Sequence, residues 1–301
     1  MLISLTGISG FVGKNLSKYL SNKDNSVNGV SLRNANWKVD LDRDSTAIIH
    51  LAGKAHDTAN TSADEEYFKV NTELTKKLFD EFVDSDIRDF IYFSSVKATA
   101  DTVDGILDEG HASDPKTPYG KSKLLAEEYL LSKKLPEGKR FFIIRPCMIH
   151  GPGNKGNLNL LYKVVEKGVP WPLAAFDNKR SFLSIDNLNF LIHEILKNKD
   201  IPSGIYNFAD DESISTNDLI EIIGKASGRK SKLWRLPSAM ISSVAKLGDA
   251  LKLPLNSERL KKLTESYQVS NEKIKNTLHI KTLPVSAEEG LFKTIKSFKN
   301  K

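Results

Sequence analysis

Short apolar runs alternate with amphipathic stretches through the first half of the chain. The apolar runs predict strands over Leu2–Leu5, Val27–Leu32, Ala47–Leu51, Phe90–Phe93 and Phe141–Arg145. Apolar residues at helical spacing predict helices between them, over Gly10–Leu20, Glu65–Phe82 and Tyr119–Lys133. Because this alternation is typical of parallel strands joined by crossover helices, we predict an α/β fold with a Rossmann-like, doubly wound parallel sheet.

The alternation weakens after about residue 150, where proline and glycine become frequent. A strand over Ile205–Phe208 and a helix over Thr216–Ala226 continue the pattern further along the chain. We therefore predict a dinucleotide-binding domain over residues 1–150, completed by a strand and a helix around 181–226. Residues 151–301 are predicted to form mainly a smaller α/β lobe that binds the substrate.

The apolar content indicates no membrane span, because no stretch approaches the 18 or more consecutive apolar residues that a span requires. In the C-terminal lobe, Ser238–Leu251 has apolar residues at helical spacing, and we interpret it as a helix that covers the core rather than as a membrane-associated segment. The chain begins with a strand-like stretch and has a single cysteine, Cys147, which cannot form an intramolecular disulfide. We expect a cytoplasmic protein.

The net charge of +6 raises the question of a nucleic-acid partner. Lysines alternate with acidic residues, as over Lys69–Glu81, which is typical of a solvated helix surface. No nucleic-acid-binding motif accompanies them, so we expect no nucleic-acid partner. The excess positive charge would instead help to attract a small ligand that carries a diphosphate.

A glycine-rich turn follows the first predicted strand. Gly7, Gly10 and Gly13 lie between this strand and an amphipathic helix. Glycines at these positions permit a tight turn and a close approach of the backbone to a pyrophosphate, which then lies at the free N–H groups of the helix start. The turn predicts a dinucleotide-binding site.

The residues after the second predicted strand bear on which dinucleotide binds. NAD enzymes usually place an acid here for the ribose 2′-hydroxyl, whereas NADP enzymes place an arginine for the 2′-phosphate. Arg33 follows this strand, and the first acid is Asp40. Arg33 therefore favours NADP over NAD, although an arginine on a solvent-facing loop would give the same pattern.

A Tyr-x-x-x-Lys pattern occurs three times, and its context selects Tyr119 and Lys123. The competing pairs are Tyr19 with Lys23 and Tyr129 with Lys133. Tyr119 alone follows a Thr-Pro helix start and has a serine pair at a strand end about two dozen residues upstream. We predict that Tyr119 is the acid/base, that Lys123 lowers the pKa of its phenol together with the nicotinamide ring, and that Ser95 holds the substrate oxygen.

In order and spacing, these motifs resemble the extended short-chain dehydrogenases, in particular the UDP-glucose 4-epimerase-like (epimerase/dehydratase) group. The matching segments are Thr6–Gly13, His50–Gly53, Asn71, Phe93–Ser95, Tyr119–Lys123, Arg145–Gly153 and Arg180–Asn187. The resemblance implies NAD or NADP as cofactor. Beside the residues above, it implies cofactor contacts from Phe11, Val12, Leu41, Leu51, Ala52, Gly53, Asn71 and Pro146.

The resemblance also implies a UDP-sugar substrate, no metal, and a homodimer formed through the Glu65–Phe82 and Tyr119–Lys133 helices. Its substrate-binding residues correspond to Ser95, His56, Asn157, Leu158, Arg180 and Arg259. Related 4,6-dehydratases have an acid pair after the catalytic hydroxyl, whereas this chain has Val96 and Lys97, which argues against dehydration. A 4-epimerase and a 4-keto reductase of surface-polysaccharide sugars both remain open, as does a dinucleotide-binding sensor or scaffold without catalysis.

Overall fold

The computed structural model describes residues 1–54, 63–154, 157–251 and 256–300. Its main sheet contains six parallel strands in the order β2-β1-β3-β4-β6-β9. Their bounds are β1 (Leu2–Thr6), β2 (Ser26–Val30), β3 (Ala47–His50), β4 (Asp89–Phe93), β6 (Arg140–Pro146) and β9 (Gly204–Phe208). The predicted Rossmann-like parallel sheet is thus confirmed.

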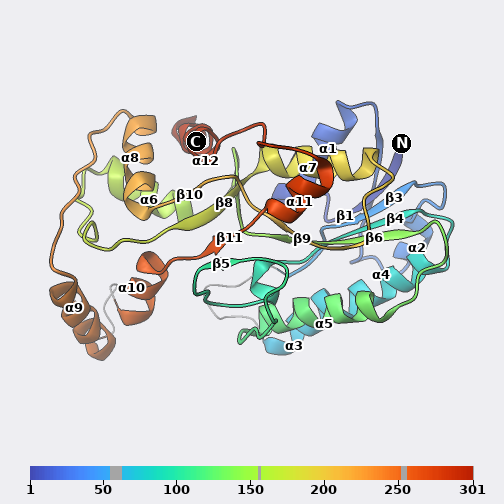
Figure 1. The fold of residues 1–301 in the computed structure, drawn as a ribbon, viewed down its shortest axis with the longest axis horizontal. Coiled ribbons are helices and arrows are strands. Elements are labelled where there is room, and N and C mark those ends of the chain that lie inside the picture. Colours follow the sequence, from blue (N-terminus) through green and yellow to red (C-terminus); the bar gives the residue numbers. More distant parts are fainter. Residues whose placement is uncertain (55–62, 155–156, 252–255, 301) are drawn as a thin grey trace.

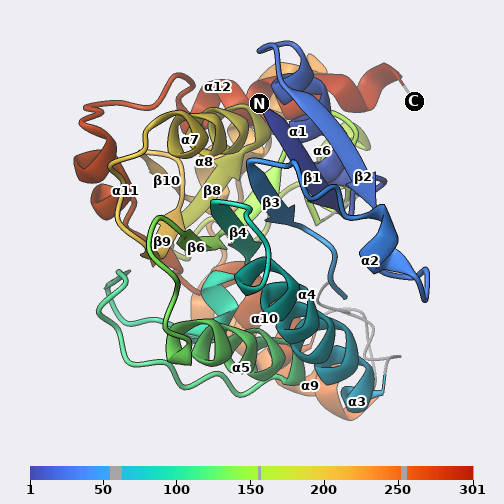
Figure 2. The ribbon, with the colours of Figure 1, turned by 90° about the vertical axis from the view of Figure 1, so that its right-hand side faces the viewer.

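Helices cover both faces of this sheet (Figures 1 and 2). On one face, α1 (Phe11–Ser21) packs beside α7 (Ile185–Lys197), and on the other α4 (Leu74–Val83) packs beside α5 (Pro118–Ser132). The central strands β3, β4 and β6 are buried on both sides, as their apolar runs require, whereas the edge strand β2 is partly exposed. Because β2 and β3 lie on opposite sides of β1, the chain reverses its direction across the sheet there. A ligand crevice is expected at the carboxyl ends of β1 and β3.

The predicted helix over Glu65–Phe82 is interrupted by a wider turn. It consists of α3 (Asp64–Tyr67), a π-helical segment at Phe68–Glu73, and α4. Such π-turns are rare and often occur at functional sites. Asn71 lies within this one, and its side chain is buried.

The second lobe is built around a separate apolar cluster at the other end of the molecule (Figure 1). A three-stranded sheet joins the lobes, with β7 (Met148–His150), β8 (Arg180–Ser184) and β10 (Ser213–Ile214). The helices of this lobe are α6 (Asn157–Glu166), α8 (Thr216–Ser227), α9 (Ser238–Leu251), α10 (Ser257–Thr264) and α12 (Ala287–Lys296). After β8 the chain returns to the first lobe to form α7 and β9, so the lobes are interleaved in sequence.

Smaller elements connect the lobes. Strand β5 (Ile106–Leu107) pairs in parallel with β11 (Gln268–Val269), which brings the loop after β4 against the C-terminal part of the chain. The remaining elements are α2 (Trp37–Asp40), α11 (Glu272–Leu278) and short 3-10 turns at Val96–Ala98 and Ser297–Asn300. None of the helices described here is long and apolar enough to cross a membrane.

Helix α9 covers the core of the second lobe, as the sequence predicts, through Ile241 and Ala245. Gly248 is also buried. The rest of the predicted apolar stripe does not reach the core, because Met240, Val244, Leu247 and Leu251 are 46%, 47%, 58% and 60% exposed. These larger apolar side chains face solvent.

Candidate active site

The glycine-rich turn between β1 and α1 leaves no room for side chains. Gly7 has φ = +72°, and a Cβ atom there would lie 2.7 Å from the backbone nitrogen of Ala52. A Cβ atom on Gly13 would lie 2.3 Å from the carbonyl oxygen of Gly7. Helix α1 begins after Gly10 without a side-chain cap, so its first N–H groups are presented to the crevice. The turn has the form that a pyrophosphate requires.

A chain of hydrogen bonds fixes the loop after β3 against β1. The Thr75 hydroxyl donates to the Asn71 carbonyl (2.7 Å), so it accepts from His50 Nε2 (2.9 Å). His50 Nδ1 then accepts from the Thr6 hydroxyl (2.7 Å), whose oxygen accepts the N–H of Ala52 (3.1 Å). Burial, with a smaller contribution from Lys123, lowers the pKa of His50 to about 3, so the ring is neutral. The predicted cofactor residues Leu51–Gly53 are held at the crevice by this chain.

Asn71 positions the other side of the same loop. Its side chain accepts the backbone N–H of Lys54 (2.8 Å) and donates to the Lys54 carbonyl (3.1 Å) and to the Ser122 hydroxyl (3.1 Å). A Cβ atom on Gly53 would lie 3.0 Å from Asn71 Oδ1 and 3.3 Å from Lys123 Nζ. The π-turn therefore joins the cofactor loop to α5.

Ser95, Tyr119 and Lys123 meet in one cleft of about 270 Å³. The predicted residues that line it are Val12, Leu51, Gly53, Ser95, Tyr119, Lys123 and Pro146. Ser95 follows β4, and its hydroxyl accepts the N–H of Lys97 (3.2 Å). Tyr119 lies in the first turn of α5, where the Thr117 side chain caps the helix by accepting the N–H of Gly120 (3.2 Å). Lys123 follows one turn later on the same helix face.

The pKa of Tyr119 in the protein alone lies above its ordinary value of 10.0. The lowering expected when the nicotinamide is bound remains a prediction. Burial is the largest cause of the raised pKa, because it disfavours the phenolate, and the neighbouring Tyr67 adds to it. A hydrogen bond with Ser95 acts in the opposite direction. The ring of Tyr67 lies edge-on to that of Tyr119, with centroids 6.2 Å apart. The protein alone therefore holds Tyr119 as a protonated phenol.

Lys123 is buried, and burial lowers its pKa to about 8, against an opposing effect of Glu127. Its Nζ donates to the carbonyl of Phe93 at the end of β4 (2.7 Å) and lies 4.9 Å from the ring centroid of Tyr92. The lysine is thus fixed between β4 and the cofactor loop. It remains mostly protonated at neutral pH.

Behind these residues lies a buried ion pair that joins α5 to β6. Glu127 accepts from Arg145 Nε (3.0 and 3.1 Å), pairs closely with Arg145 Nη2, and accepts the hydroxyl of Ser94. Glu127 and Arg145 are 0% and 3% exposed. Ser94 precedes Ser95, the predicted catalytic serine, and Glu127 lies four residues after Lys123. The ion pair therefore fixes the end of β4, which precedes Ser95, and α5, which carries Tyr119 and Lys123.

The other two Tyr-x-x-x-Lys pairs have structural surroundings. The hydroxyl of Tyr129 donates to the carboxylate of Asp80 (2.7 and 2.9 Å), and Lys133 pairs with the same carboxylate (3.4 Å). Tyr19 packs edge-on against His193 on α7. These contacts account for both pairs without catalysis.

Three predicted cofactor residues lie near the end of β2. Arg33 is exposed in the turn after the strand, which ends at Val30, two residues earlier than predicted. Asp40 ends α2 and accepts from the side chain of Asn34 (3.1 Å). Leu41 is buried in the core beneath the sheet. Their contacts with a cofactor remain a prediction.

Of the other predicted substrate residues, Arg180 contacts Glu265, which lines a second cleft. Arg180 starts β8, where its Nε donates to the Glu265 carbonyl (3.1 Å) and its Nη2 lies 3.7 Å from the Glu265 carboxylate. Arg259 is on α10 and exposed, whereas Leu158 is buried in the core of the second lobe. Asn157 is the first residue of α6. His56 lies outside the described residues.

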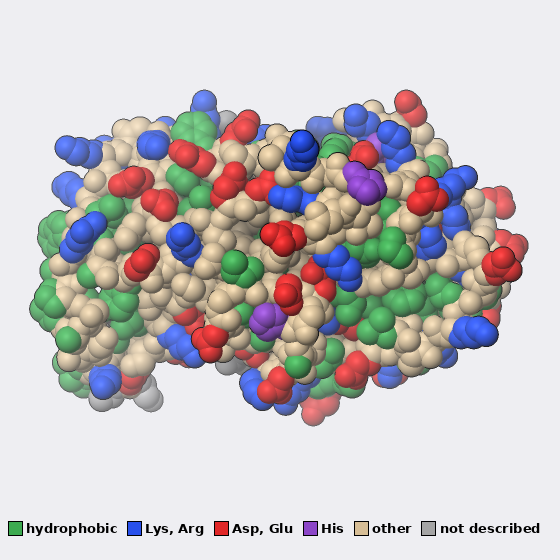
Figure 3. Space-filling model, in the orientation of Figure 1, with side chains coloured by type: hydrophobic (Ala, Val, Ile, Leu, Met, Phe, Trp, Pro, Cys, Tyr) green, Lys and Arg blue, Asp and Glu red, His purple; other side chains and the backbone are tan. Residues whose placement is uncertain are grey.

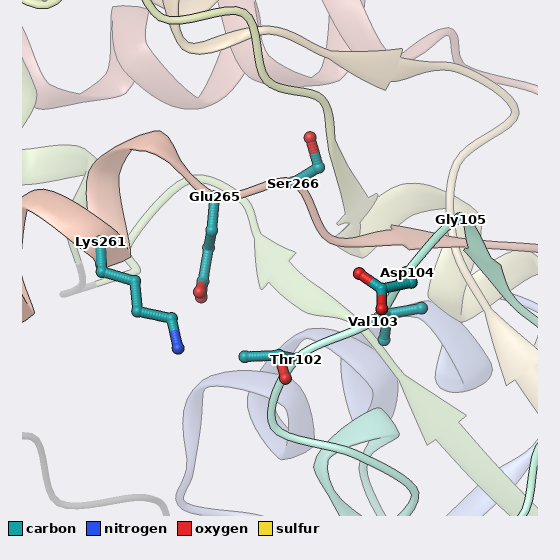
Figure 4. Close-up of a pocket in the computed structure, with 7 residues that line it drawn as sticks. All are labelled: Thr102, Val103, Asp104, Gly105, Lys261, Glu265 and Ser266. Carbon is teal, nitrogen blue, oxygen red and sulfur yellow. The ribbon is translucent and has the colours of Figure 1, made fainter. Parts of the chain in front are cut away.

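This second cleft has a volume of about 490 Å³ and lies between the loop after β4 and the segment after α10. Figure 4 shows Lys261 and Glu265 extending from one wall toward Thr102 on the other. Lys97 is close to this region, because its Nζ lies 4.1 Å from the ring centroid of Tyr267. Burial lowers the pKa of Lys97, and the negative charge of Glu265 partly opposes this decrease. The loop after Ser95 thus links the two clefts.

Comparison with known proteins decides the family. The sequence pattern of the NAD dependent epimerase/dehydratase family matches residues 3–209. The chain belongs to this family. It is 31% identical to a UDP-glucose 4-epimerase of Vibrio cholerae, over 98% of this chain and 95% of that protein. It is 27% identical to an N-acetyl-alpha-D-glucosaminyl-diphospho-ditrans,octacis-undecaprenol 4-epimerase of Escherichia coli O157:H7, over 97% and 94%.

The fold of the family is also found in solved structures. A UDP-N-acetylglucosamine 4-epimerase of Bacillus cereus superposes with a TM-score of 0.78, with 19% identity and complete coverage of both chains. As a member of an NAD-dependent family, the protein takes a nicotinamide dinucleotide. The glycine turn fits this group, because Cβ atoms on Gly7 and Gly13 would collide with backbone where the pyrophosphate is expected. Contacts of Asn71, Tyr119 and Lys123 with this cofactor remain a prediction.

Glu127 was not selected from the sequence. Thr6 and Ser94 lie within segments that were selected, but their hydrogen bonds to His50 and Glu127 were not predicted. One local signal was present for Glu127, since an acid four residues after Lys123 shares its helix face. No local signal pairs Glu127 with Arg145, because the two meet only when α5 packs against the sheet.

The Lys123 ammonium is expected to lose its proton near pH 8 in the cofactor-free protein. It should be charged below this pH and neutral above it, because burial disfavours the charged form. A pH titration of ¹³Cε-labelled lysine by NMR measures this, with Lys123→Met assigning the signal. A midpoint near the ordinary value of 10.5 would contradict the prediction.

Proposed function

We propose that this family member is a 4-epimerase of a UDP-hexose or a UDP-N-acetylhexosamine that serves surface-polysaccharide synthesis. The observation that carries the proposal is the meeting of Ser95, Tyr119 and Lys123 in one cleft beside the glycine-rich turn. Two similar proteins with almost complete coverage, from Vibrio cholerae and Escherichia coli, are 4-epimerases. A homodimer formed through α4 and α5 belongs to the same proposal.

Tyr119 moves the proton in this reaction. Its phenolate oxygen accepts the proton of the C4 hydroxyl and later returns it to the ketone oxygen. A nicotinamide bound at the crevice would supply the acceptor and donor of the C4 hydride. Ser95 donates a hydrogen bond to the same sugar oxygen, and the Lys123 charge stabilises the phenolate. Because the protein alone holds the phenol protonated, the positive charge of the oxidised cofactor is needed to make it a base.

The second cleft supports a substrate that carries a diphosphate. Lys261 lines it, and Arg180, Lys97 and Lys262 act on one another electrostatically beside it. A diphosphate would compete with the Glu265 carboxylate for the Arg180 guanidinium, whose fork suits phosphate oxygens. The first cleft would then receive the hexose.

Dehydration is not part of the proposal. The side chain of Val96 is buried and apolar, and Lys97 bonds the Asp101 carbonyl (2.7 Å). Neither position supplies the acid that expels a C6 hydroxyl.

A 4-keto reductase is the second candidate, and the position of Arg33 favours it. Arg33 is exposed just beyond the carboxyl end of β2, where a 2′-phosphate of NADP would be recognised. A reductase would exchange NADPH at each turnover, whereas an epimerase would retain its dinucleotide.

The two candidates predict different contents of the purified protein. We expect mass spectrometry of the denatured protein to find about one NAD per chain, and the protein to interconvert UDP-glucose and UDP-galactose or their N-acetyl forms without consuming NADPH. An empty protein that oxidises NADPH with a UDP-4-keto-6-deoxy-N-acetylhexosamine would select the reductase instead.

A further inference from the structure

Helix α9 carries an apolar stripe that is directed to solvent. Met240, Val244, Leu247 and Leu251 recur at helical spacing on one side of the helix and are about half exposed. Trp234, shortly before the helix, is 53% exposed. Figure 1 places α9 at the far end of the second lobe, and Figure 3 shows hydrophobic side chains gathered at that end. We call α9 and the segment 229–237 before it the α9 surface.

The net positive charge of the protein is concentrated at this surface. Residues 229–251 hold five lysines or arginines and one acid, a net charge of +4, while the whole chain has a net charge of +6. All the other residues together carry only +2. The lysines and arginines within the α9 surface itself are exposed, namely Arg229, Lys230, Lys232, Arg235 and Lys246.

This combination selects one kind of partner. A second copy of the surface would bring like charges together, which opposes self-association. A nucleic acid would satisfy the basic residues, but it would leave the apolar stripe of α9 in water. The interface of an anionic bilayer satisfies both, because its headgroups attract lysine and arginine while apolar side chains enter the acyl boundary. An exposed tryptophan is also typical of such an interface.

The surface lies apart from the proposed dimer face, and it adjoins α10, where the N–H of Ser257 donates to the Asp249 carboxylate (2.9 Å). Figure 1 separates α9 from α4 and α5 along the long axis of the molecule. Occupation of α9 would therefore leave Tyr119 and the proposed homodimer unaffected.

We propose that the α9 surface docks the protein reversibly on an anionic membrane. The stripe of α9 enters the interface, and the basic residues of 229–246 lie against the headgroups. The proposal is independent of the reaction that the protein catalyses. It requires no membrane-spanning segment, since the helix would lie in the plane of the interface.

Cosedimentation of the full chain with lipid vesicles tests the proposal. We expect binding to vesicles of phosphatidylglycerol and phosphatidylcholine, and little binding to phosphatidylcholine alone. The double variant Val244→Glu/Leu247→Glu should bind anionic vesicles at least about 10-fold more weakly, since two apolar groups are lost and two negative charges are added. The control Val39→Glu alters a side chain that is 85% exposed on α2, and should bind like the wild type.

A charge series separates the contribution of the basic residues. Lys230→Gln/Lys232→Gln should weaken binding to anionic vesicles by at least about 5-fold, whereas Lys23→Gln/Lys199→Gln, which alters exposed lysines elsewhere, should leave it unchanged. Circular dichroism and dinucleotide content verify that the variants are folded. Wild-type protein that ignores anionic vesicles would overturn the proposal. Unchanged vesicle binding by Val244→Glu/Leu247→Glu would also overturn it. The same holds if the wild type ignores vesicles but self-associates or binds RNA, and this variant abolishes that association.

Discussion

Replacing Tyr119 by phenylalanine is expected to lower kcat by a factor of about 10² to 10⁴, the usual contribution of a positioned acid/base. The substitution removes only the hydroxyl that moves the proton, and it leaves the glycine turn, Asn71 and Lys123 in place. Dinucleotide binding should therefore be retained. Steady-state kinetics with the UDP-sugar, together with the dinucleotide content of the purified variant, measure both effects.

Tyr129→Phe is the matched control, because it lies on the same helix in the same Tyr-x-x-x-Lys pattern. Its hydroxyl bonds Asp80 rather than the catalytic serine, so its loss should leave kcat nearly unchanged. Equal activity of Tyr119→Phe and wild type would argue against Tyr119 as the acid/base. Retained function of Tyr119→Phe in cells would support the non-catalytic sensor.

Glu127→Gln is expected to lower the free energy of unfolding by about 3–5 kcal/mol, since it leaves the buried Arg145 without its counter-charge. The loss of the carboxylate should also shift the pKa of Lys123 further down, because Glu127 raises it. Urea denaturation measures the first effect, and the NMR titration of Lys123 measures the second.

Two control variants distinguish the effect of breaking the buried ion pair from the effect of removing a single charge. Glu258→Gln, in an exposed pair with Lys262, should leave the urea midpoint unchanged. Glu127→Leu with Arg145→Met should be less destabilised than Glu127→Gln, because neither charge then remains buried. If Glu127→Gln matched the wild type in both stability and the Lys123 titration, the ion pair would have neither role.

The parts of the site with local causes were predictable from the sequence. The glycine turn is set by steric limits within a few residues, and Tyr119 with Lys123 requires only helical spacing and a Thr-Pro start. Ser95 could be predicted because a strand end places its side chain at the sheet edge. The parallel arrangement of the main sheet followed from the alternation of strand and helix.

What escaped prediction depends on contacts between distant segments. The partnership of Glu127 with Arg145 arises when α5 packs on β6. The partial exposure of α9 escaped prediction for a related reason, because periodicity identifies an apolar face but not which of its residues reach the core. Ile241 and Ala245 are buried, whereas Val244 and Leu247 are about half exposed. The raised pKa of Tyr119 likewise follows from burial, which spacing does not reveal.

The neutral imidazole of His50 has a consequence for how the enzyme responds to acidity. With a pKa of about 3, its ring exchanges no proton between about pH 5 and 9. The bonds from Thr75 through His50 to Thr6 and Ala52 therefore keep one fixed direction over this range. The floor of the cofactor crevice therefore keeps one protonation state over this pH range. Tyr119 and Lys123 can titrate without moving the loop after β3, which is predicted to contact the dinucleotide.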